Sequence, residues 1–149
     1  MTDLRELYQE VILDHNRRPR NRGRLDDPTG VAEGHNPLCG DNVTVTLRLR
    51  DGRVDEIAFD GVGCAVSTAS ASLMTEAVKG KTLEEAESIF RSFQSMVTDT
   101  TGGNVPNGIG DLEVLAGVRD YPVRIKCATL PWHTMRAALQ GGSEAVTTE

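Results

Sequence analysis

The side chains best suited to chemistry in this chain are three cysteines and one aspartate. Cys39 and Asp41 lie two residues apart in the stretch 36–41, Asn-Pro-Leu-Cys-Gly-Asp. Its proline fixes one φ angle and its glycine permits a tight backbone, so the stretch predicts a turn. A thiolate and a carboxylate on one bent segment can point at one centre. Cys64 and Cys127, the remaining cysteines, are distant in the sequence.

Each cysteine lies at or just before the start of a predicted element. Cys39 precedes a strand, and Cys64 and Cys127 are each expected to begin a helix, where the partial positive charge of the N-terminus favours a thiolate. Three thiolates and one carboxylate suit a tetrahedral Zn²⁺ site or an iron–sulfur cluster. The long spacings also fit unrelated buried cysteines, because free cysteine is often a core residue. The flexible Gly-Val-Gly-Cys and Cys-Gly-Asp contexts favour the metal site.

Composition limits the classes of protein to which the chain can belong. Its 149 residues suit one domain, which we expect at 1–142, followed by a disordered tail at 143–149. A net charge of −6 and few aromatic residues argue against a nucleic-acid partner. No apolar run is long enough to span a membrane. An odd number of cysteines without a secretory pattern favours metal or thiol chemistry in the cytoplasm over disulfides.

Alternating apolar residues over 43–49 predict a half-buried strand, and Ile57 and Phe59 mark a second strand. A three-residue loop at 50–52 would pair Val45 with Ile57 and place both apolar rows on one face. We therefore prefer this loop to a two-residue turn. Residues 121–126 are expected to be extended and to lead into Cys127.

Helical periodicity indicates several amphipathic segments. The chain opens with a helix that stops near residue 15, and a helix of small residues follows Cys64 and ends at Gly80. Thr82 and Glu85 form a predicted capping box for the next helix. Two further helices are expected, at 111–117 and around Trp132, with Pro131 in the first turn of the last one and two glycines, 141 and 142, closing it.

Three further features each allow two interpretations. The arginine-rich segment 17–24 is either a solvated connector or a docking patch for an acidic partner. The polar stretch 95–110 is a long loop, a kind of segment that is usually functional or disordered. We expect His15 and His35 to have surface roles and His133 to be a packing or surface residue.

Five motifs are spread along the chain: Asp14-His15, Pro19-Arg20-Asn21-x-Gly23, Asn36-Pro37-x-Cys39-Gly40-Asp41, Gly63-Cys64 and Ser72-Leu73-Met74-Thr75-Glu76-Ala77-Val78-Lys79-Gly80-Lys81. Together they resemble one known family, the IscU/NifU-type iron–sulfur cluster assembly proteins. The resemblance covers nearly the whole chain except its C-terminal tail. The fold that it implies is α+β, a small antiparallel sheet of about three strands with helices packed on one face.

Two features place the resemblance in the SufU branch. Scaffold members carry a histidine immediately before the third cysteine, where this chain has Lys126, and they lack the polar stretch 95–110. The SufU resemblance implies that Cys39, Asp41, Cys64 and Cys127 hold Zn²⁺. Cys39 would accept persulfide sulfur from a SufS-type cysteine desulfurase, after exchange of a zinc ligand with a residue of the desulfurase unmasks the thiolate.

The same resemblance implies finer roles around these ligands. Asp41, a harder ligand than thiolate, would adjust the lability of the site. Lys126 would stabilise thiolate or persulfide charge, or else is an ordinary solvated lysine. The sulfur would pass on to a downstream iron–sulfur assembly scaffold.

Three functions are therefore compared. The first is a zinc-dependent sulfur acceptor with sulfurtransferase-like activity. The second is a scaffold that assembles a [2Fe–2S] cluster on the same ligands, against which Lys126 argues because it replaces a histidine. The third is a structural zinc module that only binds partners. Metal content separates the second function from the others, and a desulfurase assay with Cys39→Ala separates the first from the third.

Overall fold

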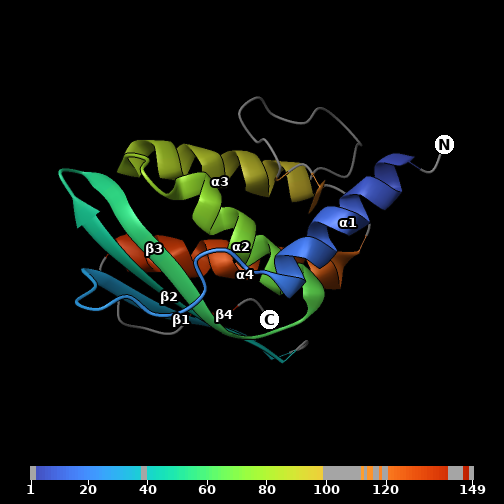
Figure 1. Ribbon diagram of the computed structural model, residues 1–149, viewed down its shortest axis with the longest axis horizontal. Helices are drawn as coiled ribbons and strands as arrows, with labels where there is room; N and C mark the ends of the chain where they lie inside the picture. The colour runs from blue at the N-terminus through green and yellow to red at the C-terminus, as the bar shows by residue number, and fades with distance from the viewer. Residues whose placement is uncertain are drawn as a thin grey trace.

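The computed structural model is a β-sheet with helices packed on one face (Figure 1). The strands are β1 (Gly30–Asn36), β2 (Asp41–Arg50), β3 (Arg53–Val62) and β4 (Val146–Thr147), in the order β3-β2-β1-β4. The helices are α1 (Asp3–Arg17), α2 (Ala65–Val78), α3 (Leu83–Thr98) and α4 (Pro122–Leu139). The structure describes residues 3–37, 40–98, 112, 114, 115, 118, 121–140, 146 and 147, with side chains from residue 9 to residue 140.

The predicted α+β class is confirmed. Strands β1, β2 and β3 form an antiparallel sheet, and β4 adds two residues parallel to β1. Figure 1 shows α2 and α4 lying over one face of the sheet, with α3 above them. We expected a disordered tail at 143–149. Val146 and Thr147 form β4, opposite Gly34 and His35; the rest of the tail lies outside the described residues, so the bounds 1–142 and 143–149 stay a prediction.

Strand β1 was missing from the prediction because its inward side is not made of large apolar residues. The strand alternates buried and exposed positions, and the buried ones are Gly30, Ala32, Gly34 and Asn36. A Cβ at Gly30 would overlap the backbone carbonyl oxygen of Ala138, on α4. Small residues are therefore needed here to let α4 approach the strand. Without large apolar residues at alternate positions, the sequence lacks the pattern by which strands are recognised.

The hairpin between β2 and β3 differs from the prediction. It has a two-residue turn, with Arg50 paired to Arg53 and positive φ angles at Asp51 and Gly52. A bulge between Arg48 and Leu49 on one side then shifts the register by one residue. Val45 consequently faces Phe59 instead of Ile57. The three-residue loop was wrong because the bulge, not the loop length, brings both apolar rows to one face.

Helices α2 and α3 start where the sequence predicts. Cys64 is the N-cap of α2. At α3 the Thr82 N–H donates to Glu85 Oε1 at 3.0 Å, and the Glu85 N–H donates to Thr82 Oγ1 at 3.1 Å. Hydrogen bonding to the Thr82 backbone N–H, and then to the Thr82 side chain, lowers the pKa of the Glu85 carboxyl. The capping box is confirmed, and α3 continues to Thr98, into the region predicted to be a loop. Residues 99–110 lie outside the described residues.

The last helix is longer than predicted. Residues 122–126, expected to be extended, form the first turns of α4. Pro122 fits the first helical position because its missing N–H has no role there. Cys127 therefore lies inside the helix instead of at its start. Pro131 is also internal, so it cannot donate a hydrogen bond to the carbonyl of Cys127, four residues earlier. The helix ends at Leu139, before the two glycines expected to close it.

Aromatic rings and a buried polar pair fix α4 against α2 and α3. Trp132 is fully buried and stacks with Phe93 at 4.8 Å between ring centroids. Its Nε1–H donates to Ser70 Oγ at 3.1 Å, and the Ser70 hydroxyl donates to the Ala128 carbonyl. Because Ala128 follows Cys127, this chain of bonds sets the depth of Cys127 relative to α2.

The region predicted as a short helix at 111–117 is described only in part. Leu112, Val114, Leu115 and Val118 are buried and in 3₁₀-helical conformation. The residues between them lie outside the described residues. In the part of the chain that the structure describes, no helix combines the length and apolarity needed to cross a bilayer.

Substituting Gly30 tests the close approach of α4 to β1. Because the added Cβ meets backbone, which cannot rotate away, we expect Gly30→Ala to lower the free energy of unfolding by about 1–3 kcal/mol. Urea unfolding followed by circular dichroism measures this change. The control is Glu33→Ala on the exposed side of the same strand, for which we expect a change within about 0.5 kcal/mol. Equal stability of the two variants would contradict the packing described here.

Candidate metal centre

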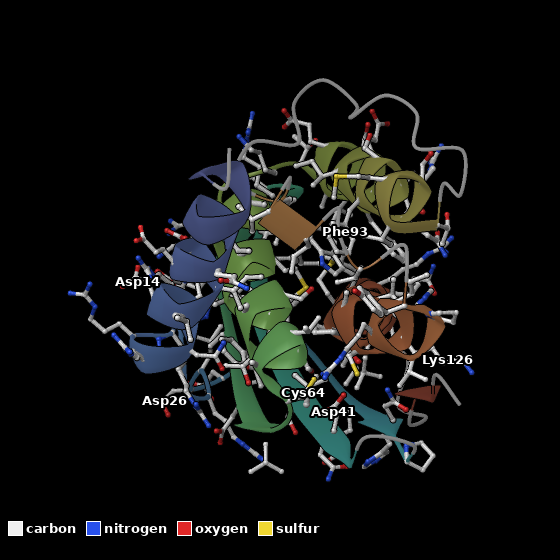
Figure 2. The ribbon with its side chains drawn as sticks, turned by 90° about the vertical axis from the view of Figure 1, so that its right-hand side faces the viewer. Asp14, Asp26, Asp41, Cys64, Phe93 and Lys126 are labelled. Carbon is white, nitrogen blue, oxygen red and sulfur yellow. The ribbon has the colours of Figure 1, made fainter. Side chains whose placement is uncertain are left out.

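Asp41 is a carboxylate almost completely removed from solvent, with 1% of its surface exposed. It is the first residue of β2, and its side chain points at the N-terminus of α2. The backbone N–H of Cys64 donates to Asp41 Oδ1 at 2.8 Å, and Cys64 Sγ lies 3.9 Å from Oδ2 (Figure 2). Burying an anion requires compensating partners. Among the described residues, both hydrogen bonds to the Asp41 carboxylate oxygens come from Cys64, at the N-terminus of α2.

Cys64 is held by the same helix end. As N-cap of α2 it is half-buried, and the backbone N–H of Ser67 donates to its Sγ at 3.5 Å. Gly63 lies so close that a Cβ there would approach Asp41 Oδ1 at 3.0 Å and Ser67 Oγ at 3.2 Å. A side chain here would crowd Asp41 and Ser67, so the glycine leaves room for Cys64 beside Asp41. A thiolate at this position accepts hydrogen bonds and faces the positive end of the helix.

Cys127 completes the described part of the site from a different element. It is fully buried in the second turn of α4. Ligand atoms of Asp41, Cys64 and Cys127 all lie within 4.8 Å of one another. Three segments far apart in the sequence thus meet at one point. Cys39, the fourth predicted ligand, lies outside the described residues, between Pro37 and Gly40.

The donor set fits a metal ion of intermediate softness. Zinc bonds of about 2.3 Å to sulfur and about 2.0–2.2 Å to carboxylate oxygen place tetrahedral ligand atoms roughly 3.5–4 Å apart. The separations of up to 4.8 Å between the described donors need only small side-chain movements to reach that geometry. Two thiols and a carboxylate suit Zn²⁺ and also iron, so the donor chemistry alone does not choose the metal.

The comparisons with known proteins agree with this geometry. Residues 7–140 match the family model described as the NifU-like N-terminal domain. The chain belongs to this family.

Its relatives include proteins of both functional types. The zinc-dependent sulfurtransferase SufU of Bacillus subtilis is 42% identical over 146 residues, which cover 95% of this chain and 97% of that protein. The iron–sulfur cluster assembly scaffold protein IscU of Streptococcus pyogenes is 39% identical over 145 residues, covering 97% and 90%. The solved N-terminal structure of a NifU-like protein from Brucella abortus superposes with a TM-score of 0.81 at 30% identity, covering 90% and 92%.

These matches confirm the family resemblance drawn from the motifs. They do not separate sulfur acceptor from scaffold, because this NifU-family chain is similar to named examples of each.

One residue beside the metal centre was not assigned a role from the sequence. Asn36 is fully buried at the end of β1, and its Nδ2 donates to Cys127 Sγ at 3.6 Å. From the sequence, Asn36 is only part of a stretch that predicts a turn. The signal that could have found it is the position of Asn36 on the inward side of β1, where a polar residue needs a partner.

Lys126 lies on α4 immediately before Cys127 and is partly exposed. In Figure 2 its side chain extends away from Asp41 and Cys64. A stabilising role at the thiolates would therefore need the lysine to swing towards them.

The surface role expected for His15 is wrong. Only 4% of its surface is exposed, and its Nδ1 lies 2.6 Å from Ser72 Oγ, with Nε2 3.7 Å from Glu76 Oε1. The ring thus joins α1 to α2. His35 is exposed, as predicted, and His133 packs edge-on against Phe90 at 5.1 Å. Burial, then the charge of nearby Arg136, lowers the pKa of His133.

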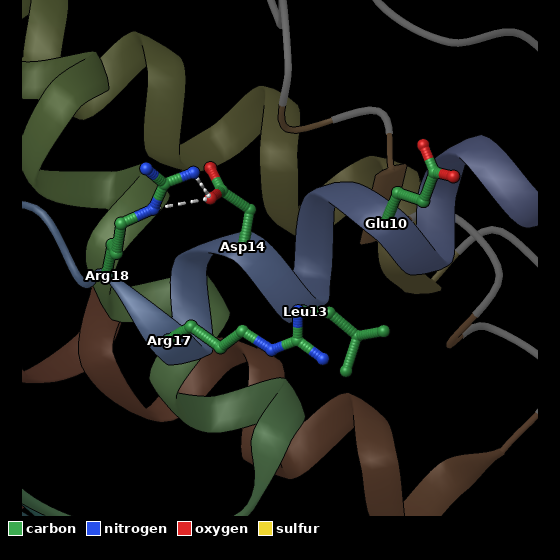
Figure 3. Close-up of a pocket in the computed structure, with 5 residues that line it drawn as sticks. All are labelled: Glu10, Leu13, Asp14, Arg17 and Arg18. Atoms are coloured by element: carbon green, nitrogen blue, oxygen red, sulfur yellow. Dashed lines mark hydrogen bonds and ion pairs between the residues drawn. The ribbon is translucent and has the colours of Figure 1, made fainter.

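The arginine-rich segment is largely tied to acidic side chains of its own chain. Arg18 and Arg20 bind the Asp14 carboxylate, at 2.7 and 2.6 Å. Hydrogen bonds from Arg20, then Arg18, lower the pKa of Asp14 to about 2. Arg22 and Arg24 lie 3.9 and 3.6 Å from Asp60. Figure 3 shows the hollow beside Asp14, lined also by Glu10, Leu13, Arg17 and Arg18. The mixed charges favour the connector interpretation over a purely basic docking patch.

Zinc binding should depend on the Asp41 carboxylate. Asn at this position keeps an acceptor for the Cys64 N–H but removes the anionic ligand. Added Zn²⁺ should stabilise the metal-free protein by about 2.7 kcal/mol at a hundredfold excess over its Kd. In Asp41→Asn a tenfold loss of affinity would reduce this gain by about 1.4 kcal/mol. Thermal unfolding with and without zinc measures the difference.

The matched control is Asp55→Asn, the same change at an exposed residue of β3. We expect it to respond to zinc as the wild type does. Equal zinc stabilisation of Asp41→Asn and the wild type would remove Asp41 from the ligand set.

Proposed function

We propose that this chain is a zinc-bound sulfur acceptor in iron–sulfur cluster assembly, working in the cytoplasm. Cys39 would take persulfide sulfur from a SufS-type cysteine desulfurase and pass it to a downstream assembly scaffold. The observation that supports this proposal most is the meeting of Asp41, Cys64 and Cys127 at one point, with Cys39 two residues before Asp41 in the sequence. The similarity to a named zinc-dependent sulfurtransferase supports it further.

The ligands Cys39, Asp41, Cys64 and Cys127 would hold the ion. Zinc bound there would keep the thiols ionised while lowering their reactivity towards other electrophiles. Three of these ligands are held by regular elements: Asp41 begins β2, Cys64 is the N-cap of α2, and Cys127 lies in α4. Cys39 lies in the sequence between the residues that end β1 and begin β2.

The transfer itself is a thiol–disulfide type of exchange. The Cys39 thiolate attacks the outer sulfur of the desulfurase persulfide, Cys–S–SH, and forms a new S–S bond. The original S–S bond breaks, and its electron pair leaves with the desulfurase cysteine as thiolate. The product is Cys39 persulfide, and no external oxidant or reductant is consumed.

Lys126 favours the acceptor over a cluster scaffold. A protonated lysine has no lone pair with which to bind iron, whereas the histidine that scaffold members carry at this place has one. The scaffold function is therefore the second candidate, favoured by similarity to a relative named as a scaffold. A structural zinc module is the third.

Metal analysis distinguishes zinc from a cluster. Protein purified without added metal should contain about one zinc per chain, with no acid-labile sulfide and no visible absorption. Elemental analysis and the absorption spectrum measure both. Stoichiometric iron with sulfide would overturn the zinc proposal and establish the scaffold. A control purification of the Asp41→Asn variant should contain less zinc, which ties the metal to this site.

The acceptor role is tested with a cognate SufS-type desulfurase and cysteine. Wild-type protein should increase the rate of alanine formation, and Cys39→Ala should abolish the increase because no thiol can take the sulfur. The zinc content of each sample is measured in parallel. Cys64→Ala serves as the comparison, because it weakens the metal site while leaving Cys39 in place.

If Cys39→Ala stimulates as well as the wild type does, the acceptor role is wrong. Stimulation by Cys64→Ala together with none by Cys39→Ala would show that Cys39 is required as a nucleophile and not only as a ligand.

A further inference from the structure

We propose that Asn36 is a positioning residue of the metal centre. Its side-chain amide holds the Cys127 sulfur as a fixed thiolate ligand, so that sulfur transfer is directed to Cys39. The inference rests on the metal site proposed above and adds a residue outside the ligand set.

The environment of Asn36 points to the sulfur as its partner. The residue is fully buried, and its Nδ2 donates to Cys127 Sγ at 3.6 Å, an ordinary length for the large sulfur acceptor. Its Oδ1 has no hydrogen-bond partner among the residues that the structure describes. The Asn36 amide donates to the sulfur but leaves its oxygen without a partner, which costs folding free energy. An apolar residue of similar size would avoid this cost, so protein stability alone does not explain an asparagine here.

The backbone of Asn36 gives it a second connection to the site. Asn36 is paired with Asp41 across β1 and β2, and Cys39 lies between the two in the sequence. Asn36 is therefore connected to one predicted ligand, Asp41, through the backbone pairing and to another, Cys127 on α4, through its side chain. Residues beyond the ligands commonly orient them in this way.

The two described cysteines differ in how their sulfur atoms are held. Cys64 is half-buried at the N-cap of α2 and accepts a backbone N–H from Ser67 at 3.5 Å. Cys127 lies inside α4, and the Asn36 amide donates to it. An N–H donated to a thiolate stabilises its charge and lowers its nucleophilicity. Asn36 thereby makes Cys127 a poor competitor of Cys39 for incoming sulfur.

The first test compares zinc affinity in Asn36→Asp and Asn36→Ser. Asp is nearly the same shape but replaces the donor with a negative charge beside the sulfur. Ser is uncharged and too short to reach. We expect zinc, measured by chelator competition, to bind about 10–100-fold more weakly to both variants. The sulfur-to-metal charge-transfer band of the Co²⁺-substituted protein should also shift. Circular dichroism confirms that each variant is folded.

Asn42→Asp is the matched control. It introduces the same charge on an exposed residue next to Asp41, and should leave the affinity and the Co²⁺ band unchanged. A double-mutant cycle adds a second control. If Asn36 acts through Cys127, Asn36→Ser should weaken zinc binding no further in a Cys127→Ser background. Folded Asn36 variants with wild-type zinc affinity and an unchanged Co²⁺ band would overturn the proposal.

A measurement on the wild-type chain tests the hydrogen bond from Asn36 to the Cys127 sulfur even if the variants fail to fold. With the site loaded with an NMR-active cadmium isotope, one Asn36 Nδ2 proton should show scalar coupling to the metal across the N–H···S bond. Absence of that coupling, while Cys127 Cβ protons do show coupling to cadmium, would refute the role of Asn36. Absence of both would instead refute the metal site, so the two failures are distinguishable.

Discussion

The burial of one carboxylate constrains the whole arrangement. Asp41 is 1% exposed, and an anion removed from water is tolerated only with compensating charge or donors. The Cys64 N–H at the start of α2 supplies a donor, and a metal ion would supply the charge. The end of β2, the start of α2 and the second turn of α4 must therefore stay in register, because each carries one participant.

Close packing of α4 on β1 keeps that register. Gly30 and Gly34 let the helix approach the strand, where any side chain would meet Ala138 or Thr134. The Trp132–Ser70–Ala128 hydrogen bonds then fix α4 lengthwise against α2, one residue from Cys127. Residues without a chemical role, such as Gly30, Gly34 and Ser70, therefore determine where the Cys127 sulfur lies relative to α2.

Local patterns predicted much of this fold, and non-local contacts explain what they missed. The capping box at Thr82 and the N-terminus at Cys64 follow from neighbouring residues, and both are confirmed. Strand β1 has glycines where an apolar pattern is expected, because α4 decides its composition. The extended segment before Cys127 was wrong for the same kind of reason, since burial of α4 outweighs the β preference of its first residues. The convergence of Asp41, Cys64 and Cys127 was predicted, whereas Asn36 required the structure.

The proposed function requires one zinc ion held by three sulfur atoms and one carboxylate oxygen. X-ray absorption at the zinc edge on the purified protein tests it most directly. We expect three sulfur atoms at about 2.3 Å and one oxygen atom at about 2.0–2.2 Å around the zinc, with the oxygen contribution altered in Asp41→Asn. A shell of two or fewer sulfurs, or one unchanged by Asp41→Asn, would contradict it.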